Sequence, residues 1–211
     1  MVRLEINLFF LAREAREYGS EKKLMSYTKE HVNNFHKRGY YNYLCSKEFS
    51  PVYHYVAQEI ISSNTQSVLD IGCWNGMFCK ELVAIGYAGE YFGFDLSDRA
   101  IAEAKQNFHR KNIQFASRSW EDPPLSKRFD AIYVGGVLYY IEDKALFLNN
   151  LVRSYEPKLI VVQDLISTDC SIVDELYDSV KTKFFTLALN AHKDPKRNKR
   201  QVKSIPIRFR V

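Results

Sequence analysis

The pattern of apolar and polar positions divides the chain into two parts that meet near residue 65. In the first part, apolar residues at Leu4, Leu8 and Leu11 recur at helical spacing, which predicts a helix. A second helix is expected over residues 22–37, and Ser50-Pro51 resembles an N-cap followed by proline at the first helical position. We therefore expect this first part to be a helical cap.

In the second part, short apolar runs alternate with helical patterns. The expected strands lie at residues 67–71, 91–95, 113–117, 129–134 and 159–163. The expected helices lie at residues 76–85, 97–108, 144–154 and 171–181. Two further runs, residues 183–189 and 202–210, are expected to form a terminal antiparallel hairpin. Strands separated by helices favour a mostly parallel sheet with helices on both faces. The prediction is a single α/β domain, with a cap over residues 1–64 and a seven-stranded core over residues 65–211.

The strongest chemical signal is the stretch VLDIGCWNG at residues 68–76. An apolar strand runs into a turn that opens a helix. Gly72 permits a sharp turn and lets a ligand approach the backbone, while the helix N-terminus offers free N–H groups. Asp95 ends the next strand, where a carboxylate can accept both hydroxyls of a ribose. These features predict a ribose-containing ligand at the carboxyl edge of the sheet.

This stretch resembles motif I of the class I, Rossmann-like methyltransferases, in which an acid is followed by glycines at alternate positions. Asp70, Gly72 and Gly76 match the motif, and Trp74 stands at the place of the middle glycine. The resemblance covers residues 68–164 and extends loosely to the terminal hairpin. It implies a Rossmann-like fold.

A second match is the stretch FDAIYVGGVLYYI at residues 129–141. In small-molecule methyltransferases, a similar strand is followed by a leucine and often by a histidine, and Tyr140 stands at the histidine position here. The helical N-terminus is similar to the variable cap that shapes the acceptor pocket of that family. The subgroup that this chain resembles includes the nodulation-type N-methyltransferases.

The resemblance implies that the cofactor is S-adenosylmethionine. The loop after the first core strand would cradle the amino-acid end of the cofactor, Asp95 its ribose and Leu96 its adenine. Ser119 and Trp120 fall where the family has an acid and its neighbour at the adenine edge, so that Ser119 replaces the acid. The cofactor-binding residues implied in this way are Asp70, Gly72, Cys73, Trp74, Asn75, Gly76, Asp95, Leu96, Ser119, Trp120 and Gly135. No metal is expected.

Groups that act on the methyl acceptor are expected where the fourth and fifth core strands end. The candidate catalytic residues are Tyr140 and Asp164. Asp164 has two open interpretations: a base that also orients an amine, or a capping acid after its strand. The candidate acceptor-binding residues are Tyr139, together with Tyr40 and Tyr41 of the cap. For the cap tyrosines, pocket lining and packing are equally open.

Composition indicates in which cellular compartment the protein is expected. The four cysteines form no CxxC pair and no histidine has zinc-ligand spacing, so neither a disulfide scaffold nor a zinc site is expected. A reducing, cytoplasmic setting fits this pattern best. The apolar stretch at residues 6–12 is too short and too interrupted for a signal peptide or a membrane span, so no membrane association is expected.

The net charge of +5 is unevenly placed, because residues 193–211 carry eight basic residues and one acidic residue. This segment is either a solvated loop and strand edge or a patch for an anionic partner, nucleic acid included.

The sequence therefore predicts an enzyme that transfers a methyl group from S-adenosylmethionine to an N or O atom of a small metabolite. The acceptor is expected to be a sugar, amine or phenol of a biosynthetic pathway. Two alternatives stay open: an RNA methyltransferase that uses the basic segment, and a catalytically silent partner protein. A nicotinamide dehydrogenase would normally show the GxGxxG pattern, and Phe78 occupies its third glycine position. Monomer and homodimer are both open.

Overall fold

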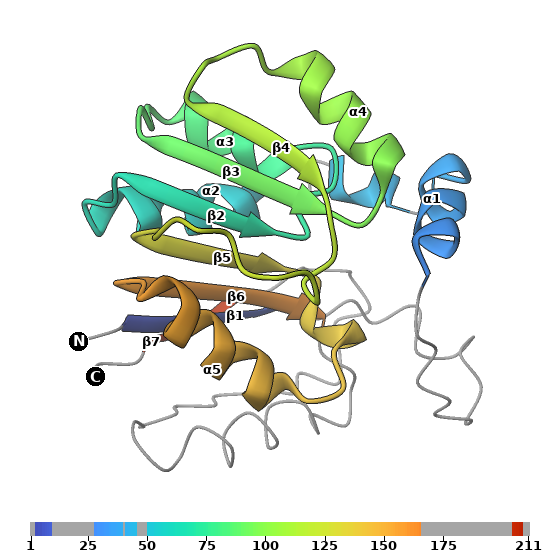
Figure 1. The fold of residues 1–211 in the computed structure, drawn as a ribbon. Helices are drawn as coiled ribbons and strands as arrows, with labels where there is room; N and C mark the ends of the chain where they lie inside the picture. The colour runs from blue at the N-terminus through green and yellow to red at the C-terminus, as the bar shows by residue number, and fades with distance from the viewer. Residues whose placement is uncertain (1–2, 10–27, 40, 46–49, 166–203, 209–211) are drawn as a thin grey trace, which may run out of the picture.

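The computed structural model describes residues 3–9, 28–39, 41–45, 50–165 and 204–208. Five parallel strands form the centre of an α/β fold, in the spatial order β4-β3-β2-β5-β6. They are β2 (Ser67–Ile71), β3 (Glu90–Asp95), β4 (Ile113–Ser117), β5 (Ala131–Gly135) and β6 (Leu159–Leu165). All five arrowheads point to one edge of the sheet (Figure 1), so the carboxyl ends of the strands meet there.

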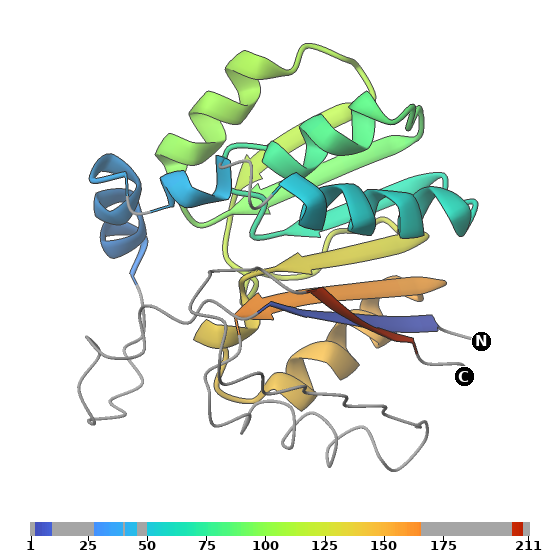
Figure 2. The same cartoon turned by 180° about the vertical axis from the view of Figure 1, so that it is seen from behind.

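Helices cover both faces of this sheet. One face carries α2 (Ser50–Ser62), α3 (Met77–Ala84) and α4 (Asp98–Asn107), and the other carries α5 (Lys144–Tyr155), as Figures 1 and 2 show. The helix α1 (Lys29–Lys37) lies beyond the carboxyl ends of the strands, next to α4. Two short 3-10 helices, η1 (Asn42–Cys45) and η2 (Leu138–Tyr140), also lie near that edge.

Because side chains alternate along each strand, one sheet contributes residues to two apolar cores. Successive side chains of a strand point to opposite faces. In β2, Val68 belongs to the core under α2, α3 and α4, whereas Leu69 belongs to the core under α5. Ile160, Val161 and Val162 of β6 are all buried, since a strand covered on both faces needs apolar residues at every position.

One prediction, the helix expected at the N-terminus, was wrong. Residues Arg3–Phe9 form a strand, β1, and not the helix expected there. It pairs parallel with β6 and antiparallel with β7 (Ser204–Arg208), which gives the sheet the order β4-β3-β2-β5-β6-β1-β7. Leu4, Ile6 and Leu8 alternate with polar residues, which is the period of a strand, and pairing satisfies the open edge of β6.

Most predicted elements between residues 50 and 165 are confirmed to within a few residues. The strand β6 continues to Leu165, so that Asp164 lies inside the strand and not after it. The helix predicted at residues 171–181 and the hairpin arm predicted at residues 183–189 lie outside the described residues. In the part of the chain that is described, none of the helices is long and apolar enough to cross a membrane.

Candidate functional site at the carboxyl edge of the sheet

The loop between β2 and α3 is built from three left-handed residues at alternate positions. The φ angles of Gly72, Trp74 and Gly76 are 81°, 46° and 85°. A side chain at Gly72 would also collide with its neighbours, because a Cβ atom there would lie 2.2 Å from Cγ2 of Val137. The loop therefore combines a tight turn with close packing against the segment that follows β5.

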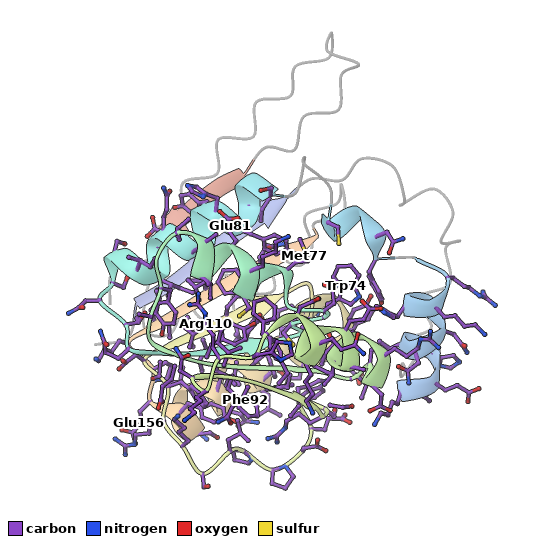
Figure 3. The ribbon with its side chains drawn as sticks, turned by 90° about the horizontal axis from the view of Figure 1, so that it is seen from above. Trp74, Met77, Glu81, Phe92, Arg110 and Glu156 are labelled. Carbon is purple, nitrogen blue, oxygen red and sulfur yellow. The ribbon has the colours of Figure 1, made fainter. Side chains whose placement is uncertain are left out.

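Trp74 adopts a conformation that favours glycine, and two hydrogen bonds hold it there. Left-handed backbone at a bulky residue costs on the order of 1–3 kcal/mol. The backbone N–H of Trp74 donates to Oδ2 of Asp95 (3.0 Å), and its indole Nε1–H donates to Nδ1 of His36 (2.8 Å). Trp74 is buried, and Figure 3 shows it at the end of the molecule where α1 lies.

Asp95 lies at the end of β3, and its carboxylate is oriented by two backbone amides. Oδ2 accepts from Trp74, and Oδ1 accepts from the N–H of Ser97 (2.8 Å). Burial raises the pKa of Asp95, and the hydrogen bonds from Ser97 and Trp74 oppose that rise. Each carboxylate oxygen has a second lone pair, so the group can still accept from a hydroxyl.

Asp70 lies in the core, two residues before the loop begins. Its side chain is fully buried and accepts a hydrogen bond from the hydroxyl of Tyr91. Burial raises the pKa of Asp70 to about 8. Among the described residues, Oδ1 of Asp70 and Oδ1 of Asn75 are buried oxygens without a hydrogen-bond partner. Asp70 lies in β2, two residues before Gly72, and Asn75 lies within the loop.

Three residues near this loop were missed by the sequence analysis as parts of a site. His36 on α1 contacts Trp74, and its Nε2 lies 2.8 Å from Oε1 of Glu103 on α4. Nδ2 of Asn75 donates to the other oxygen of Glu103 (3.4 Å). Asn33, three residues before His36, accepts from the hydroxyl of Ser97 (2.8 Å). The sequence held one signal for these residues: Asn33 and His36 are three positions apart, which places them on one side of a helix.

Aromatic side chains from three segments meet beside the loop. The hydroxyls of Tyr41 and Tyr140 lie 3.3 Å apart, and the ring of Tyr41 contacts the ring of Trp74 edge-on at 6.4 Å. Tyr140 is 37% exposed. Tyr40 and the side chains of Tyr139 and Asp164 lie outside the described part of the structure. The structure thus brings Tyr41 and Tyr140 together and says nothing of the other three candidates.

The predicted adenine side of the site is formed by the loop after β4. The N–H of Arg118 donates to the carbonyl of Asp95 (3.0 Å), which holds this loop next to the end of β3. The N–H of Ser119 donates to the carboxylate of Asp122 (2.9 Å). Trp120 is 39% exposed and contacts the ring of Phe147 edge-on at 5.4 Å. Leu96, half-buried, directly follows Asp95.

The remaining candidates concern β5 and the cysteines. Gly135 ends β5, and a Cβ atom there would lie 2.9 Å from the ring of Tyr133; beside the next residue, Gly136, no atom lies within 4 Å of where a Cβ atom would stand. Cys73 is buried, and burial raises the pKa of its thiol. Within the described ranges, no three histidine, cysteine or acidic residues gather in a way that could hold a metal ion.

The chain is similar to proteins of one family. A family model described as a methyltransferase domain matches residues 62–205. The ubiquinone biosynthesis O-methyltransferase of Nitrobacter winogradskyi is 30% identical over 92 residues, which cover 43% of this chain and 34% of that protein. The tRNA U34 carboxymethyltransferase of Nautilia profundicola is 27% identical over 138 residues, covering 62% of this chain and 46% of its own. The chain therefore spans less than half the length of these two relatives.

Solved structures share the fold. The crystal structure of N-methyltransferase NodS from Bradyrhizobium japonicum WM9 has a TM-score of 0.57 at 20% identity, covering 78% of this chain and 97% of that one. The plantazolicin methyltransferase BpumL, crystallised in complex with SAH and a triazolic desmethylPZN analog, has a TM-score of 0.52 at 18% identity, covering 70% and 58%. The α/β fold with its central parallel strands is thus shared with known methyltransferases.

Proposed function

Because this chain belongs to the methyltransferase domain family, we propose that it binds S-adenosylmethionine at the carboxyl edge of its sheet and transfers the methyl group to a small metabolite. The observation that carries the proposal is the pairing of the loop with Asp95. The loop has three left-handed residues, and the backbone of its middle residue donates to that carboxylate. An acid held at the end of the second strand, beside a glycine turn, is suited to a ribose.

The residues present fit this cofactor. Asp95 offers an oriented carboxylate to the ribose hydroxyls, and Leu96 offers an apolar side chain to the adenine. The buried oxygens of Asp70 and Asn75 that lack a hydrogen-bond partner are suited to the ammonium group at the amino-acid end. Gly136 leaves open space beside the backbone, whereas a Cβ atom at Gly135 would lie 2.9 Å from the ring of Tyr133, so a side chain is disfavoured at Gly135. Ser119 and Trp120 complete the adenine side, through a hydroxyl and an aromatic ring.

Cys73, Trp74 and the two glycines of the loop contribute by their backbone. The N–H groups of Gly72 and Cys73 both donate to the carbonyl of Phe94 (2.9 and 3.1 Å), which fixes the loop to β3. When bound, the cofactor supplies an activated methyl group on a sulfonium. The protein then has to align a nucleophile with that carbon, and alignment contributes up to about 7–11 kcal/mol in well-oriented reactions.

The acceptor is proposed to lie against the aromatic side chains beyond the loop. Tyr41 and Tyr140 offer ring faces with polar tips, which suits a flat or ring-shaped acceptor with a hydroxyl or an amine. We assign Tyr140 to orienting the acceptor, Asp164 to orienting an amine or taking a proton, and Tyr40 and Tyr139 to lining the pocket. The likeness to a ubiquinone biosynthesis O-methyltransferase supports a small acceptor in a biosynthetic pathway. A cytoplasmic setting is part of the same proposal.

The first test of this function is calorimetric titration with S-adenosylhomocysteine (SAH), the product of methyl transfer. We expect a dissociation constant in the micromolar range, on the order of −8 kcal/mol. Asp95→Ala should weaken binding at least tenfold, because a hydrogen bond to a charged group contributes about 1.5–3 kcal/mol. Glu90→Ala is the matched control: Glu90 is an exposed acid at the opposite end of the same strand. Equal affinities for the two variants would remove Asp95 from the ribose site.

An RNA acceptor is the second candidate. The likeness to a tRNA-modifying enzyme and the eight basic residues of residues 193–211 favour it. Nucleic-acid binding through these residues would weaken steeply as salt is raised. Filter binding of tRNA and of an unrelated RNA at physiological salt separates the two candidates. Weak and unselective binding supports the small acceptor, and tight, selective binding supports RNA.

A further inference from the structure

Trp74 is held from two sides, and only one of them belongs to the sheet. Its backbone N–H is bound by Asp95 of β3, whereas its indole N–H is bound by His36 of α1. The distance from Nε1 to Nδ1 is 2.8 Å, and the two rings meet edge-on with centroids 5.8 Å apart. The side chain of His36 is only 7% exposed. The contact is therefore a buried one, between a helix outside the sheet and the middle of the cofactor loop.

The two partners of His36 fix its tautomer. An indole N–H can only donate, so Nδ1 of His36 must be the unprotonated acceptor. The proton of the neutral ring then lies on Nε2, which donates to Oε1 of Glu103 (2.8 Å). The second oxygen of Glu103 accepts from Nδ2 of Asn75, at 3.4 Å. The contacts form a closed circuit: α1 to the loop, α1 to α4, and α4 back to the loop.

This circuit matters because Trp74 stands where the methyltransferase motif has a glycine, and a glycine needs no contacts to keep left-handed backbone. A glycine adopts left-handed backbone readily, but a tryptophan does so only when its surroundings hold it there. The side chain that makes this conformation unfavourable is the same side chain that His36 binds. The loop conformation that places the backbone of residues 72–76 next to Asp95 therefore depends in part on α1.

We propose that His36 is a positioning residue for the cofactor, which acts through Trp74: by accepting from the indole, it holds the loop in its binding conformation. The inference deepens the function proposed above and rests on it, since the ligand is the same cofactor. His36 touches the loop and is assigned no contact with the cofactor itself. The helix α1 is, on this view, part of the cofactor site as well as of the acceptor cap.

Two amide substitutions at His36 separate its two hydrogen bonds. An asparagine amide reaches about as far as Nδ1, so His36→Asn keeps an acceptor for Trp74 and loses Glu103. A glutamine amide reaches about as far as Nε2, so His36→Gln keeps a donor for Glu103 and loses Trp74. Trp74→Phe keeps an aromatic ring at this position, removes the indole donor and leaves a smaller side chain. The control is His54→Gln, at an exposed histidine of α2 that is bonded to Glu81 and Gln58.

The first readout is the affinity for SAH, measured by calorimetry on the full chain. Loss of one hydrogen bond predicts that His36→Gln and Trp74→Phe each weaken binding by about three- to tenfold. The double variant His36→Gln/Trp74→Phe should bind SAH no more weakly than the single variant with the lower affinity, because both substitutions remove the same hydrogen bond. His36→Asn and His54→Gln should bind like the parent. Parent-like binding by His36→Gln, with an unchanged melting temperature, would overturn the inference.

The second readout is independent of any ligand. The chain has two tryptophans, so Trp120→Phe leaves Trp74 as the only indole. In that background, His36→Gln should increase iodide quenching of Trp74 fluorescence in the free protein, and His36→Asn should not. Quenching that is unchanged by His36→Gln would overturn the role of His36 in holding Trp74. A parent protein that binds no SAH would instead overturn the proposed function, whatever the fluorescence shows.

Discussion

The sheet core and the helix α1 are held by different kinds of contact. The central strands are covered on both faces by apolar side chains, such as Leu69 and Ile132, that are fully buried. The helix α1 contributes no residue to either apolar core. It is attached by polar pairs: Lys29 with Asp98 (2.7 Å), Asn33 with Ser97 (2.8 Å) and His36 with Trp74 (2.8 Å).

With His36 as the positioning residue proposed above, the apolar contacts keep the protein folded and a polar contact of α1 completes the site. Burial of apolar area is non-directional and tolerates small shifts, whereas a hydrogen bond between two side chains fixes one geometry. Substitutions in the core should therefore lower the free energy of unfolding. Substitutions in the buried contact of α1, that of His36 with Trp74, should change the site while most of that free energy is kept. Four variants test this comparison.

The largest effect is expected in the core. Ile132 lies in β5, is fully buried, and packs under α5. Ile132→Ala should lower the free energy of unfolding by about 2–5 kcal/mol, through lost burial and a residual cavity. Urea denaturation measures this change, with the exposed Ile61→Ala as the matched control. A loss below about 1 kcal/mol would mean that the core does not carry the fold in the way described.

The next effect is a pH dependence inside the core. Burial raises the pKa of Asp70 to about 8, whereas an unfolded chain titrates near 3.8. The folded state therefore binds more protons between these values, and stability should fall as the pH rises from about 4 to about 8. Asp70→Asn cannot titrate, so its unfolding free energy should vary by about 1–3 kcal/mol less between pH 5 and pH 8.

Urea unfolding of the parent and of Asp70→Asn at both pH values provides the measurement. The pH dependence of the unfolding free energy that remains in Asp70→Asn is assigned in part to Asp95, whose pKa is also raised by burial. Identical slopes for the two proteins would show that Asp70 is ionised in the folded state throughout this range.

A smaller effect is expected where the core and α1 meet. The hydroxyl of Ser97 accepts from the N–H of Ala100 at the start of α4 and donates to Asn33 of α1. Ser97→Ala removes a helix cap and should cost about 1 kcal/mol of unfolding free energy. It also releases one contact of α1, so it should expose α1 to limited proteolysis more than Asp143→Ala, which removes only the cap of α5. Equal proteolysis of both variants would argue against a role of Ser97 in holding α1.

The smallest effect is expected for the outermost pair. Lys29 and Asp98 are about half exposed, so solvent screens their attraction. Lys29→Ala should change the free energy of unfolding by less than about 1 kcal/mol and leave the affinity for SAH unchanged. A large loss of affinity in this variant would mean that the ion pair, and not the buried His36 contact, places α1.

The sequence predicted the core well and the first residues wrongly, whereas the helix expected over residues 22–37 is present over Lys29–Lys37 and the next helix begins at Ser50, as predicted. Strands such as residues 67–71 and 113–117 were found with unchanged bounds, because an apolar run beside a turn signal is a local property. Arg3–Phe9 was predicted as part of a helix from Leu4, Leu8 and Leu11, although Ile6 between the first two shows the period of a strand. The partner strand that decides between the two periods is β6, more than 150 residues away along the chain.

The candidate site, too, was predicted from the sequence only in part. The motif identified Asp70, the loop and Asp95 from local order along the chain, since a strand, a turn and a helix in sequence place an acid at a known edge. It could not show that Trp74 takes the left-handed backbone of a glycine, or that His36 binds its indole. Trp74 and His36 are 38 residues apart, and no repeat or spacing links them.

By itself, then, the sequence determined the alternation of strands and helices and the apolar cores, because each follows from local periods and turn residues, and it predicted the edge of the sheet at which a ligand would bind. Only the tertiary structure decided which strand completes the sheet beyond β6, which residues hold the cofactor loop, and which tyrosines meet across the site. These depend on contacts between segments distant in the chain, and a hydrogen bond between two side chains leaves no periodic trace in the sequence of either segment.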